Sequence, residues 1–294
     1  MATIVHPISL EALRILCDAD TTIFNKLLRD ASSSTQDSKE ANEEISSWSP
    51  NAVTFNNEGH VIQLDLSGRR IKNFPHEAFT HLPFLKVLNL GGTDVPLPQL
   101  IKVLEECCAT VQQLYLGGNG LGDAGIQAIS EHVLSRSDCA IMKLDLRYND
   151  FGSLGAIAIS GAWNKSPNNS CKLKYLYMEG NRIGDEGAIA LASALRDQAT
   201  SIQELYLGDN RIGQDGATHL AQSLLSNTSL RKLFLEGNQI GPVGAAAFTS
   251  VLHQMDGTSA LKNLYVDNNG IGKEESMLLA RALNNASVID DLKC

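Results

Sequence analysis

The chain has 294 residues, and its 43% of hydrophobic residues is enough to build the core of one elongated domain or two globular ones. Its 33 acidic and 24 basic residues give a formal net charge of -9, and no basic patch gathers, which argues against nucleic acid and anionic membranes as partners. The six cysteines form no CxxC pair and no zinc-type spacing, and we find neither a secretory leader nor a membrane span. We therefore expect a reduced, cytoplasmic protein.

The first part of the chain, residues 1–58, differs in composition from the rest. Residues 8–29 have the spacing of an amphipathic helix, and the polar stretch ASSSTQDSKEANEE predicts a mobile linker. Asn57, Glu58 and Gly59 then predict a tight turn between two strands. We interpret residues 1–58 as an N-terminal cap: a helical segment, a mobile polar linker and the start of a hairpin.

Residues 59–294 repeat one pattern, L-x-x-L-x-L-x-x-N-x-L, and form the second predicted domain, with eight repeats and a partial ninth. The eight copies begin at Val61, Leu85, Val111, Ile141, Leu173, Ile202, Leu230 and Leu261. The ninth position of the pattern is asparagine in the last six copies. These ladder asparagines, expected to be structural, are Asn119, Asn149, Asn181, Asn210, Asn238 and Asn269.

Each copy predicts a strand, a turn and a helix. In ELYLGDN, Leu205 and Leu207 alternate with Tyr206, so the leucines face the interior of a short strand and the tyrosine faces away. An asparagine at the strand end carries donors and an acceptor for backbone groups that the turn leaves unpaired. The segment DEGAIALASALRDQ then has helical spacing of its apolar residues.

Stacked copies bury a continuous core that no single copy can bury alone. Because helices are wider than strands, a helix on the outside of every coil curves the stack. We therefore expect an α/β fold: a leucine-rich repeat solenoid, a right-handed horseshoe with a parallel sheet on its concave face and helices on its convex face.

The segment LYLGDNRIGQDGATHLAQSLLSNTSLRKL and its counterparts over residues 100–294 resemble the ribonuclease-inhibitor-like subclass of leucine-rich repeats. That subclass also supplies the sensing domains of NOD-like receptors and the fold of the Ran GTPase-activating protein. The first repeat, VIQLDLSGRRIKNFPHEAFTHLPFL, is shorter and resembles the plant or typical subclass. The resemblance implies the fold and leaves the function open, because the shared residues are core and turn positions.

The concave face is the predicted binding surface. The fifth position of each repeat points outward between two leucines, and it is aromatic in the last four repeats, which predicts a row about 15 Å long beside an acidic margin. The alternative interpretation is that the rings only cover one another and steady the sheet. The predicted partner-binding residues are Tyr115, Arg147, Tyr148, Tyr177, Glu179, Tyr206, Asp209, Phe234, Glu236, Tyr265 and Asp267.

No nucleophile with a base, metal cluster or phosphate loop can be recognised in the sequence, so we expect no catalytic residue, metal or cofactor. We predict a non-enzymatic intracellular recognition or scaffold module. Its partner would be a protein or peptide with apolar and basic side chains, bound by ring burial and cation–π contact. The alternative is a GTPase-activating regulator of a small GTPase, for which Arg147 and Arg211 are the available arginines. Ribonuclease inhibition is a third hypothesis, with less support because such inhibitors are longer and richer in cysteine.

The C-terminal end predicts an uncapped stack. After Ile271 the sequence has one more helix and begins another coil at Ile289 and Leu292, with no polar capping helix after it. We therefore expect either that the natural chain continues or that this edge pairs with a partner or a second copy.

Overall fold

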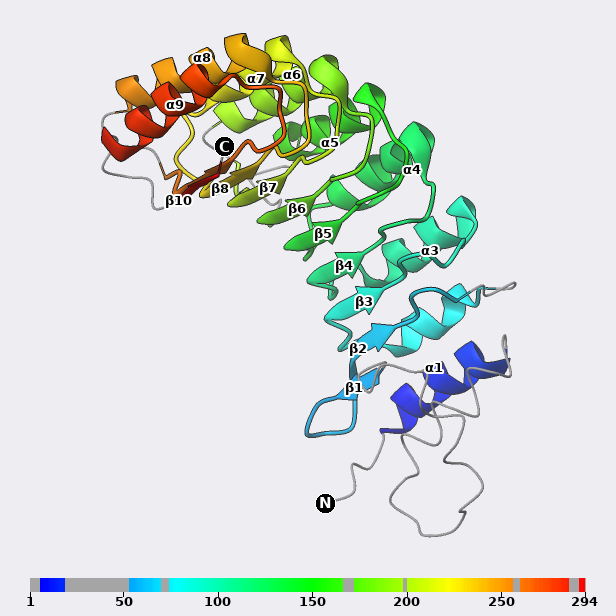
Figure 1. Cartoon of the computed structure of the whole chain (residues 1–294). Helices are drawn as coiled ribbons and strands as arrows, with labels where there is room; N and C mark the ends of the chain where they lie inside the picture. The colour runs from blue at the N-terminus through cyan, green and yellow to red at the C-terminus, as the bar shows by residue number, and fades with distance from the viewer. Residues whose placement is uncertain are drawn as a thin grey trace, which may run out of the picture. The chain divides into compact units, whose positions relative to one another are not determined.

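Short strands and helices alternate along the chain in the computed structural model (Figure 1). The structure describes residues 6–18, 53–69, 74–165, 172–197, 200–255, 260–285 and 291–293. Two compact units divide the chain: unit 1 is Met1–Asn119 and unit 2 is Gly120–Cys294. The division at residues 58 and 59 expected from the sequence stays a prediction.

Unit 1 is a sheet of four strands in chain order. Its first two strands form an antiparallel hairpin, and the next two add in parallel. Helix α1 packs against η2, a short 3-10 helix, and covers only the start of the helical range expected at residues 8–29. Residues 19–29 and the expected linker lie outside the described residues. The elements are α1 (Pro7–Asp18), β1 (Val53–Phe55), β2 (Val61–Asp65), η2 (His76–His81), β3 (Val87–Asn89), α3 (Leu97–Cys107) and β4 (Gln113–Tyr115).

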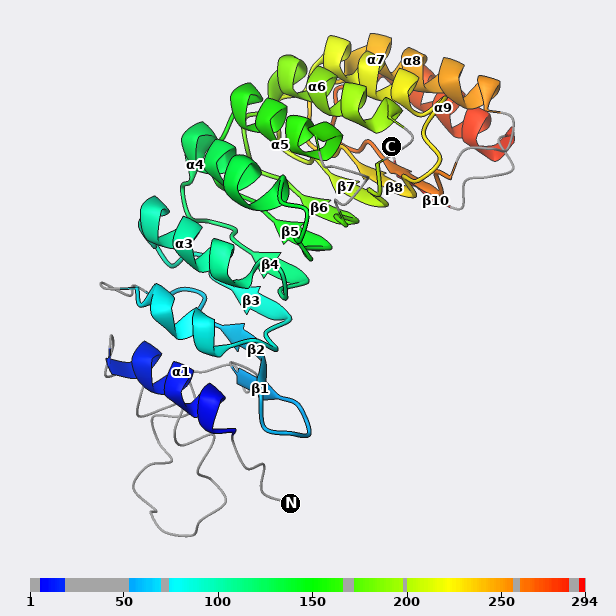
Figure 2. The same ribbon diagram turned by 180° about the vertical axis from the view of Figure 1, so that it is seen from behind.

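Unit 2 has strands on the inside of a bend and helices on the outside (Figures 1 and 2). The strands follow one another in chain order, and all neighbouring pairs from β5 to β10 are parallel. The elements are α4 (Gly122–Ile129), η3 (Ser130–Leu134), β5 (Lys143–Asp145), α5 (Ser153–Lys165), β6 (Tyr175–Tyr177), α6 (Gly184–Arg196), β7 (Glu204–Tyr206), α7 (Gln214–Ser223), β8 (Lys232–Phe234), α8 (Gly241–Gln254), β9 (Asn263–Tyr265), α9 (Lys273–Asn285) and β10 (Asp291–Lys293).

All eight predicted repeat strands are present, and β10 adds a strand from the ninth copy. Equivalent leucines pair across neighbouring strands, as Leu176 does with Leu205 and Leu205 with Leu233. These leucines are fully buried, while the residues beside them on the strands are half-buried. The repeat therefore forms the predicted α/β leucine-rich repeat solenoid in which the leucines build the core.

The ladder asparagines bond one coil to the next. Asn181 donates its side-chain NH2 to the carbonyl of Met178 in its own coil, at 2.8 Å, and to that of Leu146 in the preceding coil, at 3.1 Å. Its Oδ1 accepts the backbone N–H of Asn149 at 2.9 Å. Thr93 stands at this position in an earlier repeat, where its hydroxyl donates to the Leu90 carbonyl at 2.8 Å. A threonine thus satisfies one carbonyl that an asparagine would reach.

The recurrent GxxG segments have a structural explanation. In α6 and α7, Asp185 Oδ1 accepts the backbone N–H groups of Gly213, at 2.7 Å, and Gly216, at 2.9 Å, in the next coil. A Cβ at Gly216 would lie 2.7 Å from that oxygen, so only glycine fits there. Asp123 makes the same two contacts with Gly152 and Gly155. A carboxylate of the chain thus occupies the helix N-terminus where a phosphate would bind.

Candidate functional site

The aromatic row is the most regular feature of the inner face of unit 2, the sheet face turned away from the helices. The row consists of the four rings at the fifth position of neighbouring repeats. Their centroids lie 4.3, 4.0 and 4.4 Å apart, and the planes are inclined by 18°, 8° and 10°. The middle rings therefore cover each other's faces, and only their edges are left uncovered by neighbouring rings of the row. In order along the sheet the four are Tyr177, Tyr206, Phe234 and Tyr265.

Cations of the chain itself lie over the face of Tyr177 that points away from Tyr206's strand. Lys143 Nζ is 5.0 Å and Arg147 Cζ is 5.7 Å from the centroid of this ring. The cation–π contacts expected from a partner are thus made within the chain at this ring. A basic group of a partner would therefore be expected to pair with the acidic residues beside the row, because the ring faces are already covered.

A polar pair runs beside the aromatic row at the third position of two repeats. The Tyr206 hydroxyl donates to Glu204 Oε2 at 2.8 Å, and Lys232 Nζ lies 3.0 Å from Glu204 Oε1. Burial is the main cause that raises the pKa of Tyr206, and the hydrogen bond to Glu204 is the second. The hydrogen bond to Glu204 also raises the pKa of Lys232. Glu204 and Lys232 are not among the binding residues predicted from the sequence. Their signal was their position, two residues before an aromatic of the row.

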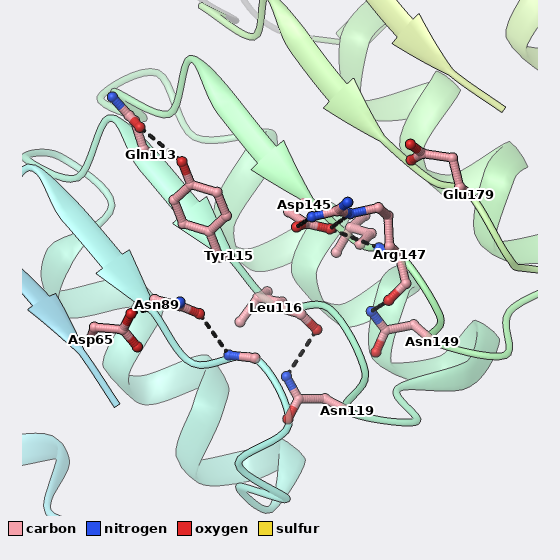
Figure 3. A network of polar contacts seen from close by, with 12 residues as sticks. Asp65, Asn89, Gln113, Tyr115, Leu116, Asn119, Asp145, Arg147, Asn149 and Glu179 are labelled. Atoms are coloured by element: carbon pink, nitrogen blue, oxygen red, sulfur yellow. Dashed lines mark hydrogen bonds and ion pairs between the residues drawn. The ribbon is translucent and has the colours of Figure 1, made fainter. Parts of the chain in front are cut away.

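An ion pair stands at the β5 end of this surface (Figure 3). Arg147 donates Nε to Asp145 Oδ1 at 3.0 Å and Nη2 to Oδ2 at 2.6 Å, and Asp145 Oδ1 also accepts the Arg147 backbone N–H. The Asp145 side chain is only 6% exposed and that of Arg147 is 43% exposed. This hydrogen bonding raises the pKa of Arg147. Arg147 is therefore held against the sheet by both ends of the carboxylate.

Glu179 lies near this pair, on the next coil. Burial raises the pKa of its carboxyl group, although a backbone hydrogen bond and Arg147 act in the opposite direction. Its Oε2 is buried and has no hydrogen-bond partner among the described residues. The local charge of the inner face therefore includes one carboxylate that is poorly solvated.

Tyr148 is the one exposed residue among the predicted aromatic residues of the site, all of which lie in the described part of the chain. The residue is 64% exposed, and its backbone is left-handed, with φ of 55°. The ring lies against Gly180 of the next coil, where a Cβ would collide with it. A left-handed backbone is strained for a bulky side chain, and the equivalent position is glycine in several other repeats. An exposed aromatic ring is thus held at a position that suits glycine.

The acidic margin consists of Glu179, Asp209, Glu236 and Asp267, and Asp209 has the same backbone geometry as Tyr148. Asp209, at the position equivalent to Tyr148, is exposed with φ of 54°, and its carboxylate contacts Gly237 of the next coil. Glu236 and Asp267 are half-buried on the following coils. Together with Glu179 these carboxylates give the edge of the aromatic row a negative charge.

The predicted residue Tyr115 belongs to unit 1. Its hydroxyl donates to Gln113 Oε1 at 3.0 Å (Figure 3). In the same unit Asn89 donates to Asp65 Oδ2 at 3.1 Å, so the fifth position of these repeats carries polar groups bonded to each other. The structure therefore assembles the aromatic row, the ion pair and the acidic margin within unit 2, with Tyr115 in unit 1.

In the described part of the chain, no group of three or more His, Cys, Asp or Glu side chains is placed to hold a metal ion. Across the same residues, no helix has the length and apolar character needed to cross a membrane.

Comparison with known proteins gives matches over the repeats. The family model described as Leucine Rich repeat matches residues 107–130, 139–160, 169–192, 198–221 and 226–248. NACHT, LRR and PYD domains-containing protein 3 is 30% identical in Bos taurus over 211 residues and 32% identical in Homo sapiens over 212 residues, and each match covers 69% of this chain and 20% of the relative. The Ribonuclease inhibitor of Sus scrofa is 30% identical over 157 residues, which cover 53% of this chain and 33% of the inhibitor. The chain thus spans about a fifth of the length of the NACHT relatives.

Proposed function

Because the chain is a leucine-rich repeat protein of the ribonuclease-inhibitor-like subclass, we propose that it is a non-enzymatic, cytoplasmic recognition or scaffold module. It binds a protein or peptide through the inner face of unit 2. One relative is by its name an inhibitor of a ribonuclease and hence acts on a protein. A rigid, preformed sheet face lowers the entropy lost when a macromolecule binds.

The main support for this proposal is the exposed position of Tyr148. Its ring is 64% exposed on a backbone that favours glycine, so folding alone gives no reason for a tyrosine there. Exposed tyrosine and arginine side chains are enriched among the residues that dominate protein interfaces. Tyr148 and the neighbouring Arg147 place one tyrosine ring and one guanidinium group at the same end of the aromatic row.

The negative charge of this surface favours a partner with basic side chains. Glu179, Asp209, Glu236 and Asp267 line the edge of the row, and the chain as a whole carries a net charge of -9. A segment with lysine or arginine side chains would pair with these carboxylates, while its apolar side chains cover the ring edges. The same charge disfavours nucleic acid and anionic lipid.

The alternative function, a GTPase-activating regulator, has less support. Such a protein would have to offer an arginine to the active site of its partner. Arg147 is held by both oxygens of Asp145, so its guanidinium would have to give up two hydrogen bonds first. Arg211 is exposed, with φ of 60°, and is the remaining arginine of this hypothesis. Measured hydrolysis by small GTPases with and without the chain distinguishes the two functions.

The test replaces Tyr148 with a photo-crosslinking amino acid, identifies the crosslinked protein from the native cell, and measures its affinity for variants. Tyr148→Gly should weaken binding by about tenfold or more, because it removes the exposed ring. The same variant should keep or raise the free energy of unfolding, by up to about 1 kcal/mol, because glycine relieves the left-handed backbone.

The matched control is Leu225→Ser, which removes an exposed apolar side chain that follows α7. It should leave the affinity unchanged. If Tyr148→Gly binds the crosslinked protein as tightly as the natural chain, the inner face at Tyr148 is not the binding site.

A further inference from the structure

A groove of about 550 Å³ opens on the outer, helical face of unit 2. Residues of α4 and of η3, which follows it, line one side, and residues of α5 line the other. Figure 2 shows α4 and α5 as neighbouring helices. Leu154 and Ile157 of α5 line it and are 67% and 44% exposed, although both are large apolar side chains. Gly161 lies one turn further on and leaves room at that end.

Helix α5 differs from α6 and α7 at this groove. The helices begin with equivalent segments, GSLGAI in α5, GDEGAI in α6 and GQDGAT in α7. Leu154 therefore stands where α6 has Glu186 and α7 has Asp215, and both of these acids are exposed. The same position holds Ala124 in α4 and Val243 in α8, which are also exposed, so Leu154 is the largest apolar side chain at this solvent-facing position of the five helices.

The opposite wall is irregular as well. After α4 the chain makes a π-turn, Ser130–Leu134, in which the Ser135 N–H bonds to the Ser130 carbonyl at 3.1 Å. The Ser130 hydroxyl borders the groove, is buried and has no hydrogen-bond partner among the described residues. Turns of this kind within helices occur frequently at functional sites. The wider turn and the unpaired hydroxyl are features that helix packing alone does not favour.

The rim of the groove is negatively charged on the α4 side. Glu131 is exposed, and its Oε1 accepts a hydrogen bond from Gln127 Nε2 at 2.9 Å. No ion pair to Glu131 occurs among the residues the structure describes. A cation on an occupant of the groove would meet this carboxylate beside the apolar pair Leu154 and Ile157.

We infer that this groove binds an amphipathic helix of a protein partner. The occupant inserts two apolar side chains, one helical turn apart, against Leu154 and Ile157, and places a lysine or arginine near Glu131. This is a second binding site, on the opposite layer of unit 2 from the aromatic row, and it does not depend on the function proposed for the inner face.

The walls favour a helix over an extended segment. Both walls are helices whose backbone groups bond internally, so an extended peptide would find no strand edge with which to pair its own N–H and C=O groups. A helical occupant satisfies those groups itself and presents only side chains, which is the geometry of helix-in-groove recognition. The width between two neighbouring helices suits one row of apolar side chains.

The experiment uses helical peptides as the probe. A displayed library of peptides about four turns long, with leucine or isoleucine one turn apart and a variable charged position, is selected against the whole chain. The selected peptide is then synthesised, and its affinity and helix content are measured with the natural chain and with variants.

Leu154→Glu should lower the affinity for the selected peptide by about tenfold or more, because it places a charge in the apolar contact. It should fold normally, since α6 has Glu186 at this position. If circular dichroism shows that it does not, Ile157→Thr, which copies Thr218 of α7, takes its place. Leu225→Glu, away from the groove, should have no effect.

The charge contact has its own test. Glu131→Lys should lower the affinity for a peptide that carries lysine. A peptide in which glutamate replaces this lysine should bind the variant with the affinity regained. A selected peptide that gains no helix on binding, or that binds Leu154→Glu as tightly as the natural chain, overturns the inference. Failure of the selection to give any binder does the same. Dimerisation of the chain that Leu154→Glu abolishes would assign the groove to a second copy and also overturn it.

Discussion

On the inner face of unit 2 each aromatic ring contacts the ring at the same position of the next repeat, with centroids 4.0 to 4.4 Å apart. On the outer face Leu154 and Ile157 border an open groove and are 67% and 44% exposed. The inner row repeats one position over four coils, whereas Leu154 and Ile157 belong to the single helix α5. The two surfaces differ because the two layers have different spacings between coils.

The spacing explains the contrast physically. Paired strands lie about 4.8 Å apart, which is close to the separation of stacked rings, so one residue type in register becomes a continuous row. Packed helices lie about 8 to 10 Å apart, and a side chain at one position of a helix does not cover its equivalent on the next. Substitutions on the inner face should therefore affect neighbouring repeats, whereas those on the outer face should act locally.

The largest effect is expected between the two faces, at Asn210. Its side-chain NH2 donates to the carbonyls of Met178 and Gly208 at 2.9 and 3.0 Å, and the residue is fully buried. Asn210→Leu removes these two bonds and leaves the backbone N–H of Ile183, which donates to Asn210 Oδ1 at 3.4 Å, without this acceptor. The free energy of unfolding should therefore fall by about 3 kcal/mol, because each of the three buried hydrogen bonds contributes about 1 kcal/mol. Urea unfolding followed by circular dichroism measures it.

Gln239→Leu is the control, because Gln239 is an exposed amide next to the ladder position of the following coil. It should change the free energy of unfolding by less than about 0.5 kcal/mol. A loss below about 1 kcal/mol for Asn210→Leu would contradict the role given to the asparagine ladder.

An intermediate effect is expected at Phe234, whose ring lies between those of Tyr206 and Tyr265. Phe234→Ala should lower the free energy of unfolding by about 2 kcal/mol, because two stacked contacts and part of the buried area are lost. Combined with Tyr206→Ala, it should show a coupling of about 1 kcal/mol. Val243→Ala, at an exposed position of α8, is the outer-face counterpart and should have little effect.

Strict additivity of Tyr206→Ala and Phe234→Ala would show that the rings do not stabilise one another, and the contrast between the faces would lose its physical basis. The expected loss of stability also separates these residues from Tyr148. A binding defect at Phe234 has to be corrected for unfolding, whereas one at Tyr148 does not.

The smallest effect is expected at Glu179, and it depends on pH. Burial raises the pKa of this carboxyl group in the folded state above its ordinary 4.5, so the folded state favours the protonated form. The natural chain should therefore lose stability as the pH rises from 4.5 through the folded-state pKa. Glu179→Gln should lack this loss and show a higher melting temperature at pH 7, with little difference below pH 4.5.

The measurement is a series of melting temperatures between pH 4 and about pH 8. Glu186→Gln, which removes an exposed carboxylate from the outer face, is the control. A melting temperature of Glu179→Gln that falls below that of the natural chain at pH 7 would mean that attraction to Arg147 outweighs the burial of the charge.

The sequence by itself determined the repeat, its strands and its core. Alternation around Leu205 and Leu207 places side chains on two faces of a strand, and this depends only on local backbone geometry. Asparagine at one fixed position predicted the ladder, because an amide is suited to pair the backbone groups of a turn. The aromatic row also followed from position, since equal positions of neighbouring coils lie side by side.

Only the tertiary structure decided what those positions can bind. The ring faces are covered by other rings, Arg147 is held by Asp145, and Tyr148 lies over Gly180 on a strained backbone. Each of these facts depends on the distance and orientation of one coil relative to the next, which no single repeat encodes. The groove beside Leu154 belongs to the same class, because it opens where a π-turn and an apolar helix face each other.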